Sequence, residues 1–425
     1  MKEEFVHTIW KYQLFNKQNL RTVDGKSIEI IQPGFSHANA GPDFISAKIK
    51  IDGMLWAGNV ELHVKSSEWY LHKHHVDPAY NNVILHVVYV DDADICTTAN
   101  NLNLHTLELG LLIDEKTMRA YEQLSNSLQE LPCKLWWNRI DKPIVEAWLI
   151  RMCIERLMRK CENLKHRLHQ LNEHWDQLFF ELVARQLGFH VNSYPMEMLA
   201  KSIKIEWVQK LSDQDISIDA LFFGQAGMLQ KKFSDEYPNR LKKEYEFLQK
   251  KFNLSPMDLS LWKFLRLRPN NFPSVRIAQL ASIFKTHSRF FSEIIELTSL
   301  ETLESFFTLN LHPYWNNHFR FDKESPPNNK QFSEESMDQL LINTIAMVWL
   351  LYGDQKNDLN YKQKCIALLE RIKPEKNRYT ERFKEVKYPL GSSIQSQGQR
   401  FLWEHYCDHK KCLTCSIGIH GLKYS

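Results

Sequence analysis

Long apolar runs are missing from this sequence of 425 residues. The longest one, Ile342–Tyr352, is far shorter than the roughly 20 residues that a membrane-spanning helix needs. The N-terminal residues, MKEEFVHTIWKYQLF, also lack the basic region and apolar stretch of a signal peptide. These absences predict a cytoplasmic protein without a membrane partner.

A large excess of charge of one sign is missing as well. The 54 basic and 51 acidic side chains give a net charge of only +3. The chain as a whole therefore has no strongly basic field that would draw it to nucleic acid, although a local patch stays open. Its 43% hydrophobic and 25% charged residues are ordinary globular values that exclude large-scale disorder. The eight cysteines are expected to be reduced, because no export signal precedes them.

The stretch Pro33–Val90 contains an unusual density of acids and histidines. Residues Ile45–Asp52 alternate between apolar and polar side chains, which predicts a half-buried strand. Asp52 and Gly53 then favour a tight hairpin turn, and Leu55–Lys65 forms the return strand. A third strand is predicted over Val83–Val90, where near-continuous apolarity indicates that both faces are covered.

The fold class predicted from these patterns is α+β. We expect a β-rich, mixed-sheet domain over residues 1–115, followed by a mainly α-helical body. Helical periodicity begins after residue 115 and is clearest over Lys142–Leu171 and Trp175–Leu187. Residues 322–333, DKESPPNNKQFS, are expected to form an exposed linker. It would separate a helical domain over 116–321 from a helical C-terminal region over 334–425 with a cysteine-rich tail.

Acid, imidazole and ammonium groups share one face of the second strand, at Glu61, His63 and Lys65. This layout resembles the PD-(D/E)xK nuclease core, in which an Asp at the start of one strand and an acid-x-Lys on the next share a divalent metal. Asp43 and Glu61 would be the two acids. The resemblance implies Mg²⁺ or Mn²⁺ at these carboxylates and nucleic acid as a partner. His63 occupies the family's lysine position, and either His63 or Lys65 could assist catalysis.

The register of the hairpin decides whether the two acids meet. A plain register from the turn at Gly53 pairs Asp43 with Leu62, on the opposite face from Glu61. One extra residue in a β-bulge would bring the acids together, and Gly58 is the predicted place for it. The alternative is an ordinary polar sheet face on which Glu61 and Lys65 form an ion pair.

A loop rich in histidine follows the second strand. It offers four residues of metal-ligand type, namely His72, His74, His75 and Asp77. On an extended segment His72 and His74 would point the same way and could bind Zn²⁺ or Mn²⁺. His74 could instead act as a catalytic acid or base near a scissile phosphate. The alternative is a solvated loop. His86, on the third strand, is expected to be a hydrogen-bonded core residue.

Three arginines surround the sequence PNNFP just before an apolar helix, at Arg266, Arg268 and Arg276. They could bind phosphate groups at the start of that helix. They could equally lock the loop through bonds to carbonyl groups, which is the interpretation we favour.

Cysteines cluster near the end of the chain, at Cys407, Cys412 and Cys415. This spacing in a reduced chain indicates zinc or an iron–sulfur cluster that attaches the tail to the body. The fourth ligand could be Cys133, Cys365 or His409. The alternative is three thiols without a metal.

Seven segments together resemble a bacterial family known as domain of unknown function 2851. They are GPDFISAKIKIDG, GNVELHVKSSEW, HHVDPAYNNVILHVV, LFFGQAGML, WKFLRLRPNNFPSVRIAQLA, YWNNHF and CLTCSIG. The resemblance covers essentially the full length and implies a bacterial cytosolic protein of unassigned activity. From the residues we expect a metal-dependent phosphodiesterase acting on nucleic acid. The alternatives are a non-catalytic scaffold or binding protein, and a zinc or manganese hydrolase using residues 72–77.

Overall fold

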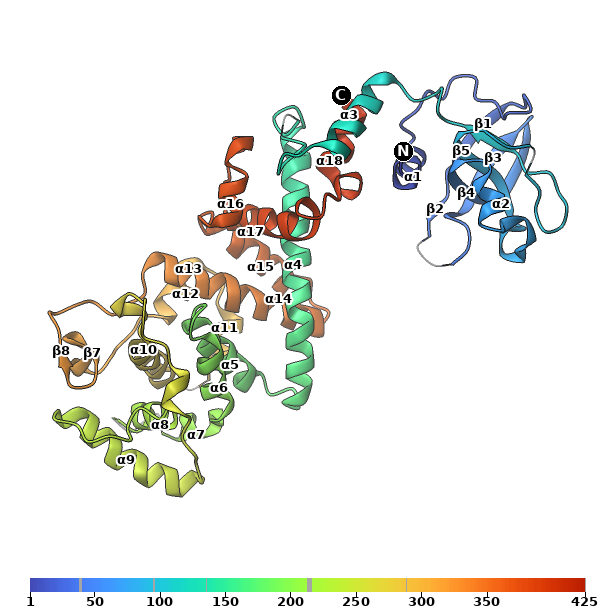
Figure 1. Ribbon diagram of the computed structural model, residues 1–425. Helices are drawn as coiled ribbons and strands as arrows, with labels where there is room; N and C mark the ends of the chain where they lie inside the picture. The colour runs from blue at the N-terminus through green and yellow to red at the C-terminus, as the bar shows by residue number, and fades with distance from the viewer. Residues whose placement is uncertain (38–39, 95, 135, 212–215, 288, 425) are drawn as a thin grey trace. The chain divides into compact units, whose positions relative to one another are not determined.

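The computed structural model describes the chain except for residues 38–39, 95, 135, 212–215, 288 and 425. It forms two compact units, each built from separate stretches of sequence. Unit 1 comprises Met1–Met152, Lys376–Pro389 and Gly398–Ser425, and unit 2 comprises Cys153–Glu375 and Leu390–Gln397. In sequence, unit 2 is thus inserted into unit 1. The predicted α+β class is confirmed, with the mixed sheet at the N-terminal end (Figure 1).

Unit 1 contains the six-stranded mixed sheet, in the order β1-β3-β4-β5-β6, with β2 also pairing to β3. Its strands are β1 (Ile28–Gln32), β2 (Phe35–Ser36), β3 (Phe44–Ile51), β4 (Met54–Lys65), β5 (Val83–Val90) and β6 (Thr106–Glu108). The pairs β1–β3 and β3–β4 are antiparallel, whereas β4–β5 and β5–β6 are parallel. Asp52 and Gly53 both have positive φ angles, of 48° and 78°, as the predicted hairpin turn requires.

The two faces of β4 are covered by different elements. The apolar face, with Val60 and Leu62 fully buried, belongs to the same core as Phe5, Ile9 and Trp10 of helix α1 (Glu3–Tyr12). Helix α1 ends at Tyr12, where Gln13 adopts a left-handed conformation and caps it. The opposite, polar face of β4 does not meet open solvent. The β4–β5 crossover, with helix α2 (Glu68–Leu71) and the short turns η1 (His74–Val76) and η2 (Pro78–Tyr80), supplies its neighbours.

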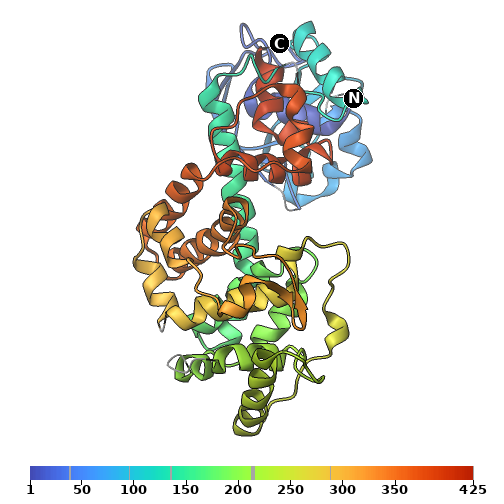
Figure 2. The same cartoon turned by 90° about the vertical axis from the view of Figure 1, so that its left-hand side faces the viewer.

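The remainder of unit 1 joins segments that are far apart in sequence. Helix α3 (Glu115–Asn126) lies beside α18 (Ser416–Tyr424), and the Thr117 hydroxyl donates a hydrogen bond to the Leu422 carbonyl at 3.3 Å (Figures 1 and 2). Gly421 packs directly on the Trp136 ring, where no larger residue fits. Helix α4 (Lys142–Gln170) begins in unit 1, and helix α17 (Ser393–Leu402) ends in it. The unit also contains α16 (Arg378–Arg382) and η7 (Lys384–Val386).

Unit 2 is mainly helical (Figure 2). Its helices are α5 (Trp175–Leu187), α6 (Ser193–Lys201), α7 (Ile205–Lys210), α8 (Ser217–Gln225), α9 (Glu236–Phe252), α10 (Pro273–Thr286), α11 (Phe290–Glu296), α12 (Leu300–Phe306), α13 (Glu334–Leu340), α14 (Ala346–Gln355) and α15 (Leu359–Arg371). A small hairpin, β7 (His318–Arg320) and β8 (Lys323–Glu324), completes it. Residues 322–333 are mostly exposed, as expected, but they include β8 and bury Lys330, whose carbonyl accepts a hydrogen bond from Gln279. They lie within unit 2. Among the described residues, no helix combines the length and apolarity needed to span a membrane.

Candidate functional site

A bulge in strand β3 determines the position of Asp43. Phe44 pairs with Val60, but three residues later Ala47 pairs with Gly58, only two residues earlier on β4. Strand β3 therefore has one extra residue, and Ser46 adopts a left-handed φ of 59° there. Because Phe44 faces Val60, Asp43 faces Glu61. The expected register shift is confirmed.

The place predicted for the bulge was wrong. The extra residue lies in β3, whereas Gly58 belongs to the regular partner strand. Gly58 has a different role, because a Cβ atom there would lie 2.5 Å from Ile84 and 2.6 Å from the Asn82 carbonyl oxygen. It is a glycine because β5 and the turn before it approach this point of β4 closely.

Asp43 and Glu61 are held together by main-chain hydrogen bonds in both directions. The Asp43 amide donates to Glu61 Oε2 at 3.1 Å, and the Leu62 amide donates to Asp43 Oδ2 at 3.0 Å. The Asp43 side chain is 20% exposed and that of Glu61 only 6%. Burial raises the pKa of Glu61, and the negative charge of Asp43 raises it further against the opposing effect of His74. The pair is thus a site of concentrated negative charge that a cation would stabilise.

Helix α1 contributes His7, which the sequence analysis missed. Its Nε2 atom lies 3.3 Å from Asp43 Oδ2 and 3.5 Å from Glu3 Oε1. Burial lowers the pKa of His7, but the close contact with Asp43 and the charges of the nearby carboxylates outweigh burial, so the pKa is raised. Side-chain exposure increases outward from Asp43 through His7, at 30%, to Glu3, at 46%. Solvent therefore reaches the acid pair from the side of α1.

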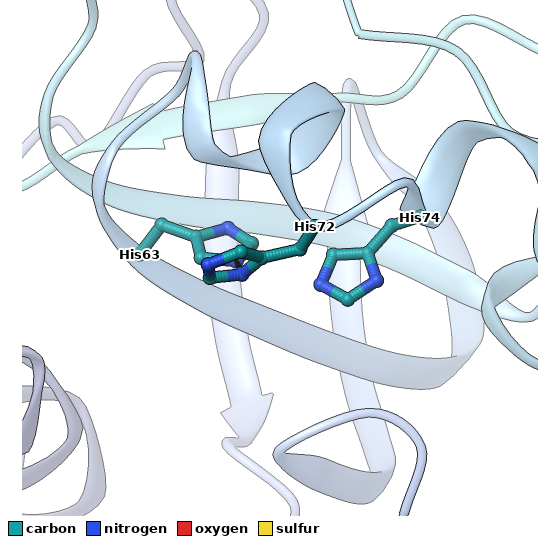
Figure 3. Close-up of side chains that lie close together, drawn as sticks. All are labelled: His63, His72 and His74. Carbon is teal, nitrogen blue, oxygen red and sulfur yellow. Dashed lines mark hydrogen bonds between the residues drawn. The ribbon is translucent and has the colours of Figure 1, made fainter.

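Imidazoles fill the space on the other side of Glu61. His63 Nδ1 lies 2.8 Å from His86 Nε2, and His63 Nε2 lies 3.1 Å from His72 Nδ1. One ring nitrogen from each of His63, His72 and His74 lies within 4.8 Å of the others, and Figure 3 shows the three rings side by side. Burial and the neighbouring imidazoles lower the pKa of His63 to about 3. His63 is therefore a neutral ring hydrogen-bonded on both sides, and His86 is the buried core residue expected.

His74 links the imidazoles to the acid pair. Its Nε2 atom lies 3.2 Å from Glu61 Oε1, and its ring stacks on Tyr80 at a centroid distance of 3.8 Å. Trp69 packs against the same ring from helix α2. The histidine loop is not the extended segment that we expected. Lys73 is left-handed between α2 and η1, and this turn brings the two histidines flanking it together.

Three of the expected site residues lie apart from this centre. The Lys65 ammonium, on a side chain 58% exposed, faces Asp92 at 3.6 Å instead of the acid pair. His75 packs against Tyr70. Asp77 is exposed and caps η2 by accepting a hydrogen bond from the Ala79 amide.

The three arginines belong to unit 2 and differ in their surroundings. Arg266 and Arg268 are exposed. The Arg276 side chain is buried, bonded to Asn271 Oδ1 and Gln279 Oε1 and placed over the Phe189 ring. Burial lowers the pKa of Arg276 to about 10. Arg276 thus locks the loop through bonds to the side-chain carbonyl oxygens of Asn271 and Gln279.

The tail cysteines gather around one small hollow. It is lined by Cys133, Cys407, Cys412 and Cys415, together with Leu131, Pro132, Tyr406, Lys411 and Gly418. Of the three candidates for a fourth ligand, Cys133 is the one that lines this hollow. Cys365 is buried in unit 2, and His409 is exposed.

The fold and this geometry define a class of protein: an α+β chain whose N-terminal mixed sheet bears a cluster of carboxylates and imidazoles. Within that class, the chain belongs to the family described as "Protein of unknown function (DUF2851)", whose model matches residues 3–378. The resemblance seen in the sequence is thereby confirmed, and the match ends before the cysteine-rich tail. No curated protein and no solved structure matches the chain significantly.

Proposed function

We propose that this chain is a divalent-metal-dependent hydrolase that cleaves phosphodiester bonds in nucleic acid, with Asp43 and Glu61 as the carboxylates that hold the metal. One observation supports this most strongly. The β3 bulge sets the two acids opposite each other on adjacent strands, in a layout similar to the acid pair of the PD-(D/E)xK core.

The donor set fits a divalent cation. Each carboxylate uses one oxygen to accept a main-chain amide from the facing strand, which fixes its orientation. The oxygens that could bind a metal are then Asp43 Oδ1 and Glu61 Oε1, of which Oε1 also contacts His74. Two such oxygens suit Mg²⁺ or Mn²⁺, which keep several waters as further ligands. A bound metal would polarise the phosphate and lower the pKa of an attacking water. His74 would orient Glu61 by its contact at Oε1, as partners of metal ligands commonly do.

The neighbouring residues constrain how catalysis would proceed. His63 stands where the PD-(D/E)xK core has its lysine. A neutral ring with a pKa of about 3 cannot supply the positive charge of a lysine. Its hydrogen bonds to the buried His86 and to the exposed His72 instead fix the orientation of the His72 ring beside the site. Substrate would enter beside His7, where Asp43 is open to solvent.

A second candidate function rests on the three imidazoles. Nitrogen ligands favour Zn²⁺ or Mn²⁺ over Mg²⁺. Ring nitrogens of His63, His72 and His74 lie close enough to share an ion. Glu61 Oε1 is 3.8 Å from His63 Nε2 and 3.2 Å from His74 Nε2. In this case the chain would be a zinc or manganese hydrolase whose metal does not contact Asp43.

Two substitutions distinguish these candidates. Asp43→Asn removes an acid ligand and leaves the imidazoles, whereas His72→Gln removes an exposed imidazole and leaves the acid pair. Binding of Mg²⁺, Mn²⁺ and Zn²⁺ would be measured by calorimetry, and cleavage on panels of single- and double-stranded DNA and RNA. Glu29→Gln, at an exposed acid on β1 that pairs with Lys50, is the matched control.

The first proposal expects Asp43→Asn to abolish metal-dependent cleavage while His72→Gln keeps metal binding. The reverse result supports the imidazole site. A wild-type protein without cleavage on any panel, and with the same metal binding after Asp43→Asn, would eliminate the nuclease and leave a binding or scaffold protein.

A further inference from the structure

Four cysteines from the two sides of the inserted unit 2 meet within unit 1. Cys133 precedes helix α4, whereas the other three follow unit 2. Cys407 ends a π-helical turn, η8 (Trp403–Cys407), Cys412 begins η9 (Cys412–Thr414), and Cys415 immediately precedes α18. We call the space that they line the cysteine hollow. Its ligand set is complete, because four thiols suffice for either a tetrahedral zinc ion or an iron–sulfur cluster.

The four thiols are free rather than paired as disulfides. Cys133 and Cys415 are buried, and Cys407 and Cys412 are half-buried. Four free thiols around one space form a donor set that a metal would hold together, since a metal stabilises thiolates.

The spacing of the sulfur atoms distinguishes the two kinds of metal. A tetrahedral zinc ion with Zn–S bonds of about 2.3 Å requires sulfurs roughly 3.8 Å apart. Among the described residues, which include all four cysteines, no three of their sulfurs lie within 4.8 Å of one another. The thiols nevertheless line one hollow. Ligands that surround a common space without converging on one point suit a polynuclear cluster, whose metal atoms stand between them.

The surroundings of Cys415 support this assignment. The main-chain amides of Ile417 and Gly418, at the start of α18, lie beside its sulfur. Amides in this position can donate to cluster-bound sulfur, which is one means by which proteins stabilise and tune iron–sulfur clusters. Gly418 is needed for this approach, because a Cβ atom there would lie 2.1 Å from the Cys412 carbonyl oxygen. Leu131 and Tyr406 add apolar walls to the hollow.

We propose that the cysteine hollow binds a four-iron, four-sulfide cluster through Cys133, Cys407, Cys412 and Cys415. Transfer of a preassembled cluster from a thiolate-ligated donor replaces four S–H bonds by four S–Fe bonds. The four protons pass to the donor's thiolates, and the oxidation state of the cluster does not change. The cluster joins the segment before α4 to the C-terminal segment and so holds together the two parts of unit 1 that the insertion separates in sequence. This role is structural and independent of the hydrolase proposed at the sheet.

Purification without oxygen provides the test. We expect a brown protein with about four iron atoms and four acid-labile sulfides per chain, and little zinc. Cys133→Ser should lose most of this iron and sulfide, whereas Cys96→Ser, at a buried thiol elsewhere in unit 1, should retain them. X-ray absorption at the iron edge of the wild-type protein should show Fe–S and Fe–Fe scattering, which requires no variant to fold. Stoichiometric zinc in place of iron, no metal at all, or iron unaffected by Cys133→Ser would overturn the proposal.

Discussion

Replacing Glu61 by glutamine should stabilise the metal-free protein while removing its response to metal. The carbonyl oxygen of the substituted side chain can still accept the Asp43 amide, and the side chain keeps its size, so packing is preserved. The substitution removes a buried negative charge. Burial raises the pKa of Glu61, and the negative charge of the neighbouring Asp43 raises it further. A carboxyl group whose pKa is raised by folding favours the folded state only below that pKa, and it destabilises the fold once ionised. Removing the charge should therefore add about 1 kcal/mol near neutral pH.

Metal reverses this order of stability. A ligand at 100 times its Kd stabilises a folded protein by about 2.7 kcal/mol, and none of this is available to a variant that does not bind. The wild type should become more stable than Glu61→Gln once metal binding stabilises it by about 1 kcal/mol. This requires a metal concentration of roughly four times Kd. Hydrogen exchange at β3 and β4 amides is the suitable assay, because two compact units need not unfold in one step.

Glu29→Gln serves as the control for this experiment and should show the wild-type response to metal. The reasoning would be refuted if Glu61→Gln opened more easily without metal and still gained the full stabilisation when Mn²⁺ was added. That result would mean that Glu61 acts only as a hydrogen-bonding residue.

Three further predictions concern other parts of the chain. Deleting Ser46 should close the bulge into a regular ladder that still sets Asp43 opposite Glu61, so calorimetry should find metal binding retained. Burial and nearby glutamates raise the pKa of Asp338 from 3.8 to about 6. The contribution of Asp338 to stability is complete below its unfolded pKa and is lost as pH rises through about 6. Asp338→Asn should therefore stabilise the protein by about 1 kcal/mol near pH 7 but not near pH 4. Thermal unfolding at the two pH values measures this difference. Gly421→Ala would place a Cβ atom 1.9 Å from the Trp136 ring, and hydrogen exchange should show α18 destabilised by about 1–3 kcal/mol.

Local sequence patterns predicted the positions of the strands well, but they did not predict where the bulge lies or which distant residues pack beside the strands. Alternation located β3 and β4, and near-continuous apolarity located β5, to within a residue or so, because both patterns can be seen in consecutive side chains. The bulge could be anticipated from the need to bring two acids together. Its position could not, since Ser46 adopts the left-handed conformation without being a glycine.

The site partners from distant segments had no local signal. His7 lies on the first helix and reaches Asp43 only because α1 packs on the sheet. The sequence offered Cys133 as one of three possible fourth ligands, and only the fold shows that it lines the same hollow as the tail cysteines. The burial of Arg276 likewise depends on Phe189, far away in the sequence, which periodicity cannot reveal.

The insertion of unit 2 within unit 1 has a consequence for the order in which the chain can fold during synthesis. Ribosomes release the sheet strands first, yet the core of unit 1 also includes Cys415, Ile417 and Leu422, which emerge only after the whole of unit 2. Helices α1 and α3, which η9 and α18 contact, must therefore wait with part of their apolar surface uncovered, while the helical insertion can already assemble. A nascent chain arrested before residue 407 should consequently depend on chaperones far more than the completed protein does.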